Sequence, residues 1–219
     1  MTEARPTRLL EFHRRPATEI LERARAFCEA ARRRRSVRHY SSEEFPIEIV
    51  ERCIEVACCA PSGANKQPWT FVLVTDRELK RQLREGAERE EAAFYAGRAS
   101  QQWLRDVGPL GTGPDKPFLE DAPAVVAVFA RKYGDEPTER HYFVSESVGI
   151  AVGFLLAALH HAGLAALVYT PSPIKFVQTL LERPTNERAL CLIPVGFPVE
   201  DCQVPDIQRR NLDEVLIRR

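Results

Sequence analysis

The residues best suited to chemistry begin with a dense run of cations, RRRRSVRHY at positions 32–40. Guanidinium groups bind the oxygens of phosphates and carboxylates in pairs, so the arginines of this run and Ser36 form a candidate anion-binding site. The same run also suits a solvated helix end, where cations offset the negative pole of the helix. The residue types leave both interpretations open.

A second candidate is the segment APSGANKQPW at positions 60–69, which lies between an expected helix and an expected strand. Pro61, Gly63 and Pro68 restrict this loop, and its small residues let backbone N–H groups approach a flat ligand. A plain connecting loop would have a similar composition, although loops often carry binding residues.

A third candidate is spread along the chain. Glu91 and Tyr95 are four positions apart and share one face of an expected helix, and Lys116 lies in the glycine-rich segment 108–117. A carboxylate, a phenol and an ammonium together match a zwitterionic amino acid. The alternative is a solvated helix face, because Glu91 ends the charged run EREE at 88–91.

A fourth candidate is Thr170, in the sequence Tyr169-Thr170-Pro171 at the end of an expected strand. Ligands of open α/β sheets bind beyond such strand ends, and a threonine hydroxyl can donate to a ring nitrogen. A turn that begins with threonine is the simpler alternative.

Several functional classes lack support. The sequence contains no GxSxG, HExxH or GxxxxGK[ST] motif. Its six cysteines form no CxxC pair and do not combine with the five histidines at zinc-site spacing, so we expect reduced thiols and no metal site. The 31 Lys and Arg residues balance 31 Asp and Glu residues, and this neutrality argues against a nucleic-acid partner.

The patterns also favour a soluble cytoplasmic protein with no membrane segment. The first residues, MTEARPTRLLEFHRR, lack the apolar stretch of a secretory signal. The apolar run Val148–Leu159 is shorter than the roughly 20 residues that span a bilayer. It is apolar on every face, so we expect a large core or a subunit interface to cover it.

The elements that must position these residues alternate along the chain, which predicts a central sheet in an α/β or α+β fold. Apolar periodicity and end signals predict the following segments. We expect helices at 17–33, from Pro46 to about 60, at 77–103, 138–162 and 175–181, and strands at 69–75, 123–130, 164–169 and 189–195.

Taken in order, these motifs resemble the FMN-dependent nitroreductase superfamily. The shared features are RRSVRHY, APSGANKQPW, the all-apolar helix, LVYTP and LIPVGFP. Within the superfamily the chain is similar to the iodotyrosine deiodinase subgroup. That similarity rests on the Glu-x-x-x-Tyr pair, a tryptophan after it, a lysine before DAPAV, and the ending VPDIQRRNLDEVL.

The resemblance implies a set of site residues. A cofactor site for FMN would comprise Arg34, Arg35, Ser36, Val37, Arg38, Pro61, Ser62, Gly63, Val168, Tyr169, Thr170 and Arg209. The Thr170 hydroxyl would lie near N5 of the flavin as the catalytic group. Substrate would be bound by Ala64, Glu91, Tyr95 and Lys116, with the Ala64 N–H on a phenolate oxygen. Pro61, Ser62 and Gly63 would reach the flavin of the partner subunit.

The resemblance also implies an architecture. It is an α+β fold with a nitroreductase-like central mixed sheet, flanked by helices, in a domain-swapped homodimer. Residues 1–30 would form an N-terminal helical arm and residues 31–219 one FMN-binding domain. That domain would include an active-site lid at about 86–118 and a C-terminal arm at 198–219.

The implied activity is reductive dehalogenation of halogenated tyrosine, with 3-iodotyrosine giving tyrosine and iodide. NAD(P)H would supply electrons directly or through a separate reductase. The alternative is a general nitroreductase or quinone reductase, since the sequence Asn65-Lys66-Gln67 resembles that wider group more than the animal deiodinases. The membrane anchor of animal deiodinases is not found in the sequence, which adds to the expectation of a soluble form.

Overall fold

The computed structural model describes residues 7–219, which separate into two units, one ending at Arg34 and one spanning Arg35–Arg219. The first unit contains α1 (Ala17–Arg33), a helix with the predicted bounds and no buried residue. The predicted arm begins with residues 1–6, which lie outside the described residues. Its boundary at residue 30 stays a prediction.

The second unit is built on a four-stranded sheet in the order β1-β2-β4-β3. The strands are β1 (Trp69–Val74), β2 (Ala124–Arg131), β3 (Ala165–Ala166) and β4 (Glu187–Gly196). All three strand pairings are antiparallel. The parallel component is an isolated bridge between Ser36 and Ala166. The helices around this sheet confirm the α+β class.

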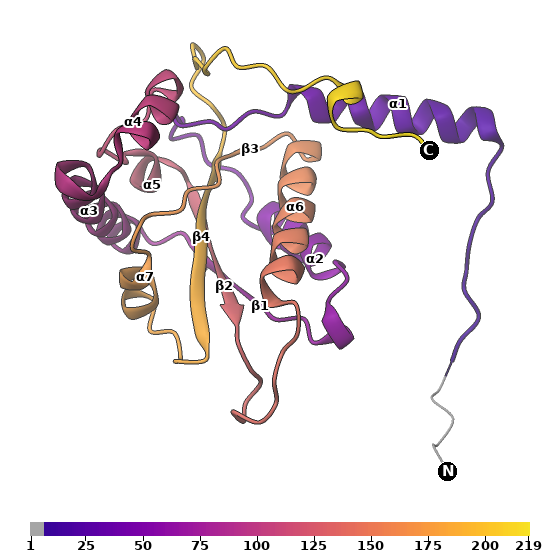
Figure 1. Ribbon diagram of the computed structural model, residues 1–219, viewed down its shortest axis with the longest axis horizontal. Coiled ribbons are helices and arrows are strands. Elements are labelled where there is room, and N and C mark those ends of the chain that lie inside the picture. The colour runs from indigo at the N-terminus through magenta and orange to yellow at the C-terminus, as the bar shows by residue number, and fades with distance from the viewer. Residues whose placement is uncertain (1–6) are drawn as a thin grey trace. The chain divides into compact units, whose positions relative to one another are not determined.

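One face of the sheet is covered by α2 (Glu48–Cys58) and α6 (Val144–His161), as Figure 1 shows. Val126 and Val128 of β2 point into this core cluster together with residues of both helices. Alternate residues of a strand point to opposite faces, so the intervening side chains face the other way.

The opposite face is covered by α3 (Arg77–Ala93), α5 (Phe118–Asp121) and α7 (Lys175–Leu180) (Figure 1). Ala127 and Phe129 of β2 belong to this second cluster. Burial on both faces explains why β2 is continuously apolar although its neighbours are antiparallel.

The apolar helix α6 is shorter than predicted, because Phe143 adopts a left-handed conformation (φ 49°) just before it. Its inner side is buried, but Ile150 and Phe154 are 43% and 40% exposed. By length and composition alone α6 could cross a membrane, yet it packs against α2 and the sheet. The expected complete cover for this helix is therefore absent from the described residues of one chain.

The predicted helix 77–103 is wrong in extent. α3 ends at Ala93, a π-helical segment (Phe94–Arg98) follows, and α4 (Gln101–Val107) begins anew. Ser100 starts α4 by accepting a hydrogen bond from the Trp103 N–H at 3.1 Å. A capping side chain of this kind favours a new helix start.

Three shorter segments complete the description. They are the 3-10 turns η1 (Gly63–Asn65), η3 (Gly108–Leu110) and η4 (Leu212–Glu214). The predicted strand 164–169 is regular only at β3, with one further bridge between Tyr169 and Leu192. The C-terminal stretch from residue 206 is exposed throughout, and its role as an arm stays a prediction.

A buried ion pair stabilises the sheet where β4 begins, at Glu187. Glu187 is 4% exposed and accepts hydrogen bonds from Arg183 Nε at 2.8 Å and Thr70 Oγ1 at 2.7 Å. Burial alone would raise the pKa of Glu187, but the hydrogen bonds from Arg183 and Thr70 outweigh it and lower that pKa.

Candidate active site

The predicted phosphate-binding segment lies beside the strand that precedes Thr170. The Val37 N–H donates to the Ala166 carbonyl at 3.4 Å, next to the Ser36–Ala166 bridge. The Arg35 guanidinium donates to the Pro205 carbonyl, which brings the C-terminal stretch to this segment. Arg35, Ser36 and Arg38 flank Val37 in the chain, so they lie along the β3 edge. All three residues are partly exposed.

Two other residues predicted to contact the phosphate, Arg34 and Arg209, lie outside the segment Arg35–Arg38. Arg34 belongs to the first unit, where its N–H caps α1 by donating to the Ala31 carbonyl at 3.2 Å. Arg209 follows Pro205 by four positions in the exposed C-terminal stretch. Their roles at a phosphate stay predictions.

The segment after β3 alternates between exposed and buried side chains. Val168 is 42% exposed and Thr170 is exposed, whereas Tyr169 is 9% exposed. The backbone of Tyr169 is fixed on both sides, because its N–H and carbonyl bond to Leu192 at 2.9 and 2.8 Å. Val168 and Thr170 therefore leave an open face next to Arg35–Arg38, which suits a flat ring that carries a phosphate.

The loop 60–69 is strained in a way that the sequence did not indicate. Ala64, Asn65 and Gln67 all have left-handed backbone conformations, with φ of 51°, 54° and 47°. Such conformations are costly for residues with a Cβ atom and gather at binding sites. Gly63 has a local reason to be glycine, since a Cβ there would lie 2.7 Å from the Tyr142 carbonyl oxygen.

The strained loop leaves one backbone donor available. The N–H groups on both sides of Ala64 are taken, by Ser147 Oγ at 3.3 Å for Gly63 and by the Ser62 carbonyl at 3.0 Å for Asn65. The Ala64 N–H has no acceptor among the described residues, and Ala64 is exposed. An unpaired N–H in a fixed loop is suited to an anionic oxygen of a ligand.

A single chain does not bring this loop to the other candidate residues. No hydrogen bond within residues 7–219 joins Pro61–Ala64 to Arg35–Arg38 or to Val168–Thr170. The loop contacts the start of α6 through Gly63 and Ser147, whereas β3 follows its far end. A helix of 18 residues is about 27 Å long, so α6 separates the two halves of the predicted site.

Glu91 and Lys116 lie together in the interior, which rules out a solvated helix face for Glu91. They are 8% and 2% exposed, and Lys116 Nζ lies 3.6 Å from Glu91 Oε2. Lys116 Nζ also donates to the Gly113 carbonyl. Burial lowers the pKa of the Lys116 ammonium, and the charge of Glu91 opposes that shift.

Tyr169 makes an interaction with this pair that sequence reasoning missed. Its hydroxyl donates to Glu91 Oε1 at 2.9 Å, and Lys116 Nζ lies 5.5 Å from the centre of its ring. Burial, followed by the negative charge of Glu91, raises the pKa of Tyr169 far above its usual range. Strand alternation was the available signal, because it turns Tyr169 away from the exposed side of Val168 and Thr170.

Tyr95 is close to the pair but bonds elsewhere. Its hydroxyl donates to the Thr112 carbonyl at 3.3 Å, and its ring meets Trp103 edge-on at 5.3 Å. Phe94 also packs edge-on against Trp103, at 4.8 Å. This aromatic cluster holds together residues 94–113, a stretch without any buried residue. Few buried contacts are expected of a segment that opens readily.

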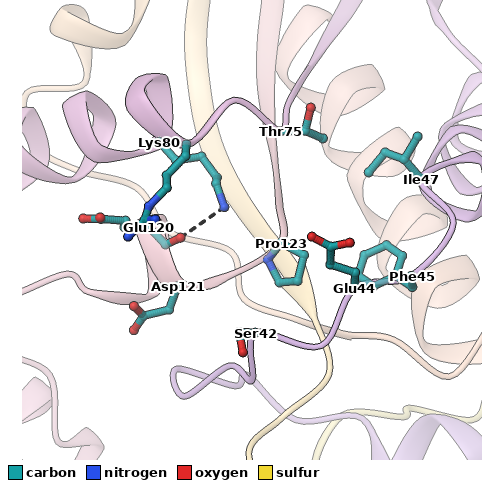
Figure 2. Close-up of a pocket in the computed structure, with 10 residues that line it drawn as sticks. Ser42, Glu44, Phe45, Ile47, Thr75, Lys80, Glu120, Asp121 and Pro123 are labelled. Atoms are coloured by element: carbon teal, nitrogen blue, oxygen red, sulfur yellow. Dashed lines mark hydrogen bonds between the residues drawn. The ribbon is translucent and has the colours of Figure 1, made fainter.

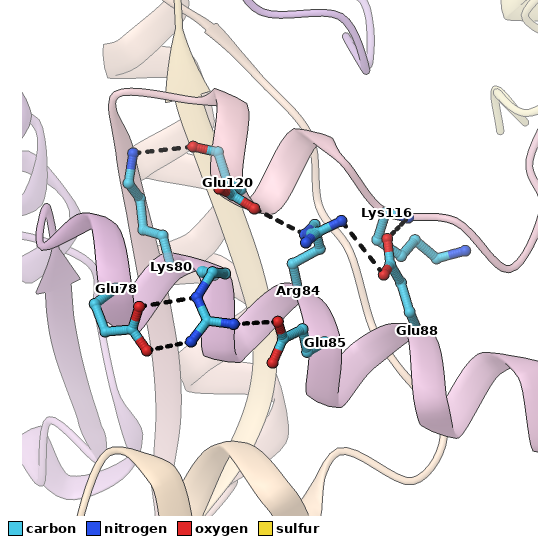
Figure 3. A network of polar contacts seen from close by, with 8 residues as sticks. Glu78, Lys80, Arg84, Glu85, Glu88, Lys116 and Glu120 are labelled. Atoms are coloured by element: carbon cyan, nitrogen blue, oxygen red, sulfur yellow. Dashed lines mark hydrogen bonds and ion pairs between the residues drawn. The ribbon is translucent and has the colours of Figure 1, made fainter.

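The two ends of that stretch are firmly anchored, as Figure 3 shows. Arg84 of α3 pairs with Glu120 of α5 at 2.8 Å, and Glu88 accepts a hydrogen bond from the Lys116 N–H at 2.9 Å. Lys80 adds hydrogen bonds to the carbonyl of Glu120 in α5 and to that of Ala122, which directly follows the helix. The predicted lid at 86–118 thus has fixed ends and a loosely packed middle.

A cavity of about 640 Å³ lies on the other side of this anchor (Figure 2). The ammonium of Lys80 is already bound there by the carbonyls of Glu120 and Ala122, at 3.1 and 2.6 Å. None of the predicted site residues lines the cavity. Its lining comprises Ser42, Glu44, Phe45, Ile47, Thr75, Arg77, Lys80, Glu120, Asp121 and Pro123.

The fold and the arrangement of these segments define a family. A family model described as the Nitroreductase family matches residues 31–197. The chain therefore belongs to the nitroreductase family, which confirms the resemblance read from its motifs.

Two similar proteins and one similar solved structure share one name. The chain is 48% identical over 202 residues to an iodotyrosine deiodinase of Haliscomenobacter hydrossis, with 91% of each protein covered. It is 42% identical over 200 residues to an iodotyrosine deiodinase of Drosophila melanogaster, covering 89% of this chain and 70% of that protein. A crystal structure of oxidized iodotyrosine deiodinase bound to FMN and 3-iodo-L-tyrosine has a TM-score of 0.76 and 35% identity, covering 88% of this chain and 97% of that one.

Proposed function

We propose that this protein is an FMN-dependent enzyme that removes the halogen from halogenated tyrosine, converting 3-iodotyrosine to tyrosine and iodide. The observation that carries the proposal is the buried Glu91–Lys116 pair near the two anchored ends of the predicted lid. Buried opposite charges are costly unless they are paired, and a free amino acid offers one partner for each. The iodotyrosine deiodinases among its relatives support the same activity.

The reaction replaces a carbon–iodine bond with a carbon–hydrogen bond. Iodide leaves with the bonding electron pair, so two electrons and a proton must be supplied. Reduced FMN supplies the two electrons when bound. Arg35, Ser36 and Arg38 would hold its phosphate, and the open face of Val168 and Thr170 would accept its ring. Thr170 makes no hydrogen bond through its hydroxyl within the described residues, which leaves that hydroxyl to donate to a flavin nitrogen.

The chain's other residues bind and orient the substrate. Glu91 would take the ammonium and Lys116 the carboxylate, while the Ala64 N–H would stabilise the phenolate oxygen. Closing the lid would exclude water and strengthen each of these charged contacts. Tyr95, held at Thr112, would complete the wall of the site from the lid itself.

We propose a homodimer as the form that completes the site. The outer face of α6 exposes Ile150 and Phe154 next to Gly149 and Gly153, and small residues spaced by four let two helices approach closely. A second copy packed on this face would supply the loop Pro61–Ala64 that α6 keeps away from Thr170 in one chain. Sedimentation velocity tests this, because Phe154→Glu should convert a dimer to monomers and release FMN. A wild-type monomer that retains FMN would contradict it.

The remaining assignments belong to the same proposal. Zero net charge supports a small-molecule substrate rather than a nucleic acid. The six free cysteines support a reducing, cytoplasmic location. A partner subunit on α6 removes the need for a membrane to cover its apolar face. NAD(P)H would donate electrons directly or through a separate reductase.

Product analysis separates this function from general nitroreductase activity. Purified protein with dithionite as reductant should convert 3-iodotyrosine to tyrosine, with iodide released in equal amount. A general nitroreductase would instead sustain NADPH-dependent reduction of a nitroarene, and halotyrosine would leave its flavin spectrum unchanged. Colourless protein without bound flavin would contradict both activities.

A further inference from the structure

Tyr169 contacts both charged groups of the Glu91–Lys116 pair. Its hydroxyl donates to Glu91 Oε1 at 2.9 Å, and the Lys116 ammonium lies 5.5 Å from its ring centre. The neighbouring Phe118 ring meets Tyr169 edge-on at 5.4 Å. Tyr169 is therefore the contact between the lid pair and the segment that carries Thr170.

The anchor behind this contact is rigid. Tyr169 is bound through its N–H and its carbonyl to Leu192 of the central strand β4. A tyrosine side chain has two main rotatable bonds, and both are restricted here by burial among Phe118 and Lys116. The backbone that carries the hydroxyl is consequently fixed by the sheet, through Leu192.

The two oxygens of Glu91 are used unequally. Oε1 accepts a hydrogen bond from Tyr169 at 2.9 Å, but Oε2 lies 3.6 Å from Lys116 Nζ, beyond the 2.7–2.9 Å of a charge-assisted hydrogen bond. Lys116 directs a hydrogen bond to the Gly113 carbonyl instead. Oε2 is thus the oxygen that an incoming ammonium can approach to hydrogen-bond distance.

We propose that Tyr169 is a positioning residue that holds Glu91 through Oε1 and presents Oε2 to the ammonium of an α-amino acid. This inference rests on the proposed function and adds a source of specificity to it. Tyr169 would favour substrates with an ammonium over halophenols that lack one. It does not touch the reacting carbon or halogen.

The test compares 3-iodotyrosine with its des-amino analogue, 3-(4-hydroxy-3-iodophenyl)propionate, which keeps the ring, the iodine and the carboxylate. Both Kd values are measured by titrating the flavin absorbance of the FMN-loaded protein. The variant Tyr169→Phe removes one hydroxyl and keeps the ring against Phe118. The matched control, Tyr40→Phe, removes another buried hydroxyl, which donates to the Pro194 carbonyl at 3.0 Å.

We expect Tyr169→Phe to raise the Kd of 3-iodotyrosine about 10-fold or more, as for loss of a hydrogen bond to a charged group. The Kd of the des-amino analogue should change less than about twofold, since that ligand does not use Glu91. Tyr40→Phe should leave both values unchanged. In a Glu91→Gln background, the Tyr169→Phe change should add little, because the two residues act through one contact.

Two results would overturn the assignment. Equal weakening of both ligands in Tyr169→Phe would show a general structural role, and unchanged binding of 3-iodotyrosine would show no role. Failure of the proposed function itself is seen earlier, when the wild-type protein neither binds 3-iodotyrosine nor releases iodide from it. If Tyr169→Phe does not fold, Glu91→Gln alone must abolish the preference for 3-iodotyrosine over the des-amino analogue, and a preserved preference would contradict the inference.

Discussion

Replacing Lys116 with methionine tests the substrate-binding role of the lid most sharply. Methionine keeps an unbranched apolar side chain of similar length, so the packing of the stem is largely retained while the charge is lost. Lys116 is 2% exposed, and no water can take over its contact with a substrate carboxylate. The variant should therefore weaken binding of 3-iodotyrosine and leave FMN bound.

The size of the effect follows from two contributions. A hydrogen bond to a charged group in an enclosed site is worth about 1.5–3 kcal/mol. Substrate binding must also separate Lys116 from Glu91, which lie 3.6 Å apart, and this free-energy cost is absent in the variant. Desolvation offsets much of the attraction in a buried pair, so the absent cost lowers the Kd of the variant only slightly. The expected rise in Kd is about 10- to 150-fold.

The assay is titration of the oxidised flavin absorbance with 3-iodotyrosine at neutral pH. Lys132→Met, which makes the same chemical change at an exposed position, is the matched control and should bind like the wild type. Thermal unfolding and FMN content of Lys116→Met confirm that the variant is folded. A Kd for 3-iodotyrosine within about twofold of the wild-type value would refute the role of Lys116.

Three further predictions concern other parts of the chain. Thr170→Ala should leave 3-iodotyrosine binding nearly intact and lower dehalogenation more than two-electron nitroarene reduction, whereas equal loss of both activities would argue against a specific role of its hydroxyl. The pKa of Glu187 is lowered in the folded protein, so its ionised form stabilises the fold above about pH 4.5. The loss of unfolding free energy in Arg183→Met should therefore be largest near pH 7 and should shrink as the pH falls below about 4.5. A loss that is independent of pH in denaturant titrations would contradict this. Burial raises the pKa of Cys191 to about 12, so mass spectrometry should find it unmodified by iodoacetamide at pH 8 until the protein is denatured, and rapid labelling of the native protein would be the contrary result.

The sequence predicted the regular elements well where local signals were strong. α1 has the expected bounds, and β1, β2 and β4 follow the β-branched and apolar runs that indicated them. It failed where a backbone conformation interrupts a favourable pattern. Phe143, with a left-handed φ of 49°, delays the start of α6, and Ser100 begins a new helix inside the predicted 77–103 segment.

The candidate site was predictable by residue type but not by geometry. The family resemblance singled out Glu91 and Lys116, whereas their charges and spacing alone left a solvated helix face open. Their mutual distance depends on how α3 and the lid return to one another. The contact from Tyr169 spans 78 positions and has no local signature. The left-handed conformation of Ala64 likewise has no local signature, and the close approach of Tyr142 to Gly63 joins segments far apart along the chain.

An anaerobic single turnover tests the central claim most directly. Protein whose FMN has been fully reduced by dithionite, with excess reductant removed, is mixed with 3-iodotyrosine. The account predicts one tyrosine and one iodide for each flavin, and return of the oxidised flavin spectrum at the same rate. Reduced flavin that persists beside unchanged 3-iodotyrosine would contradict the claim that this protein is a halotyrosine dehalogenase.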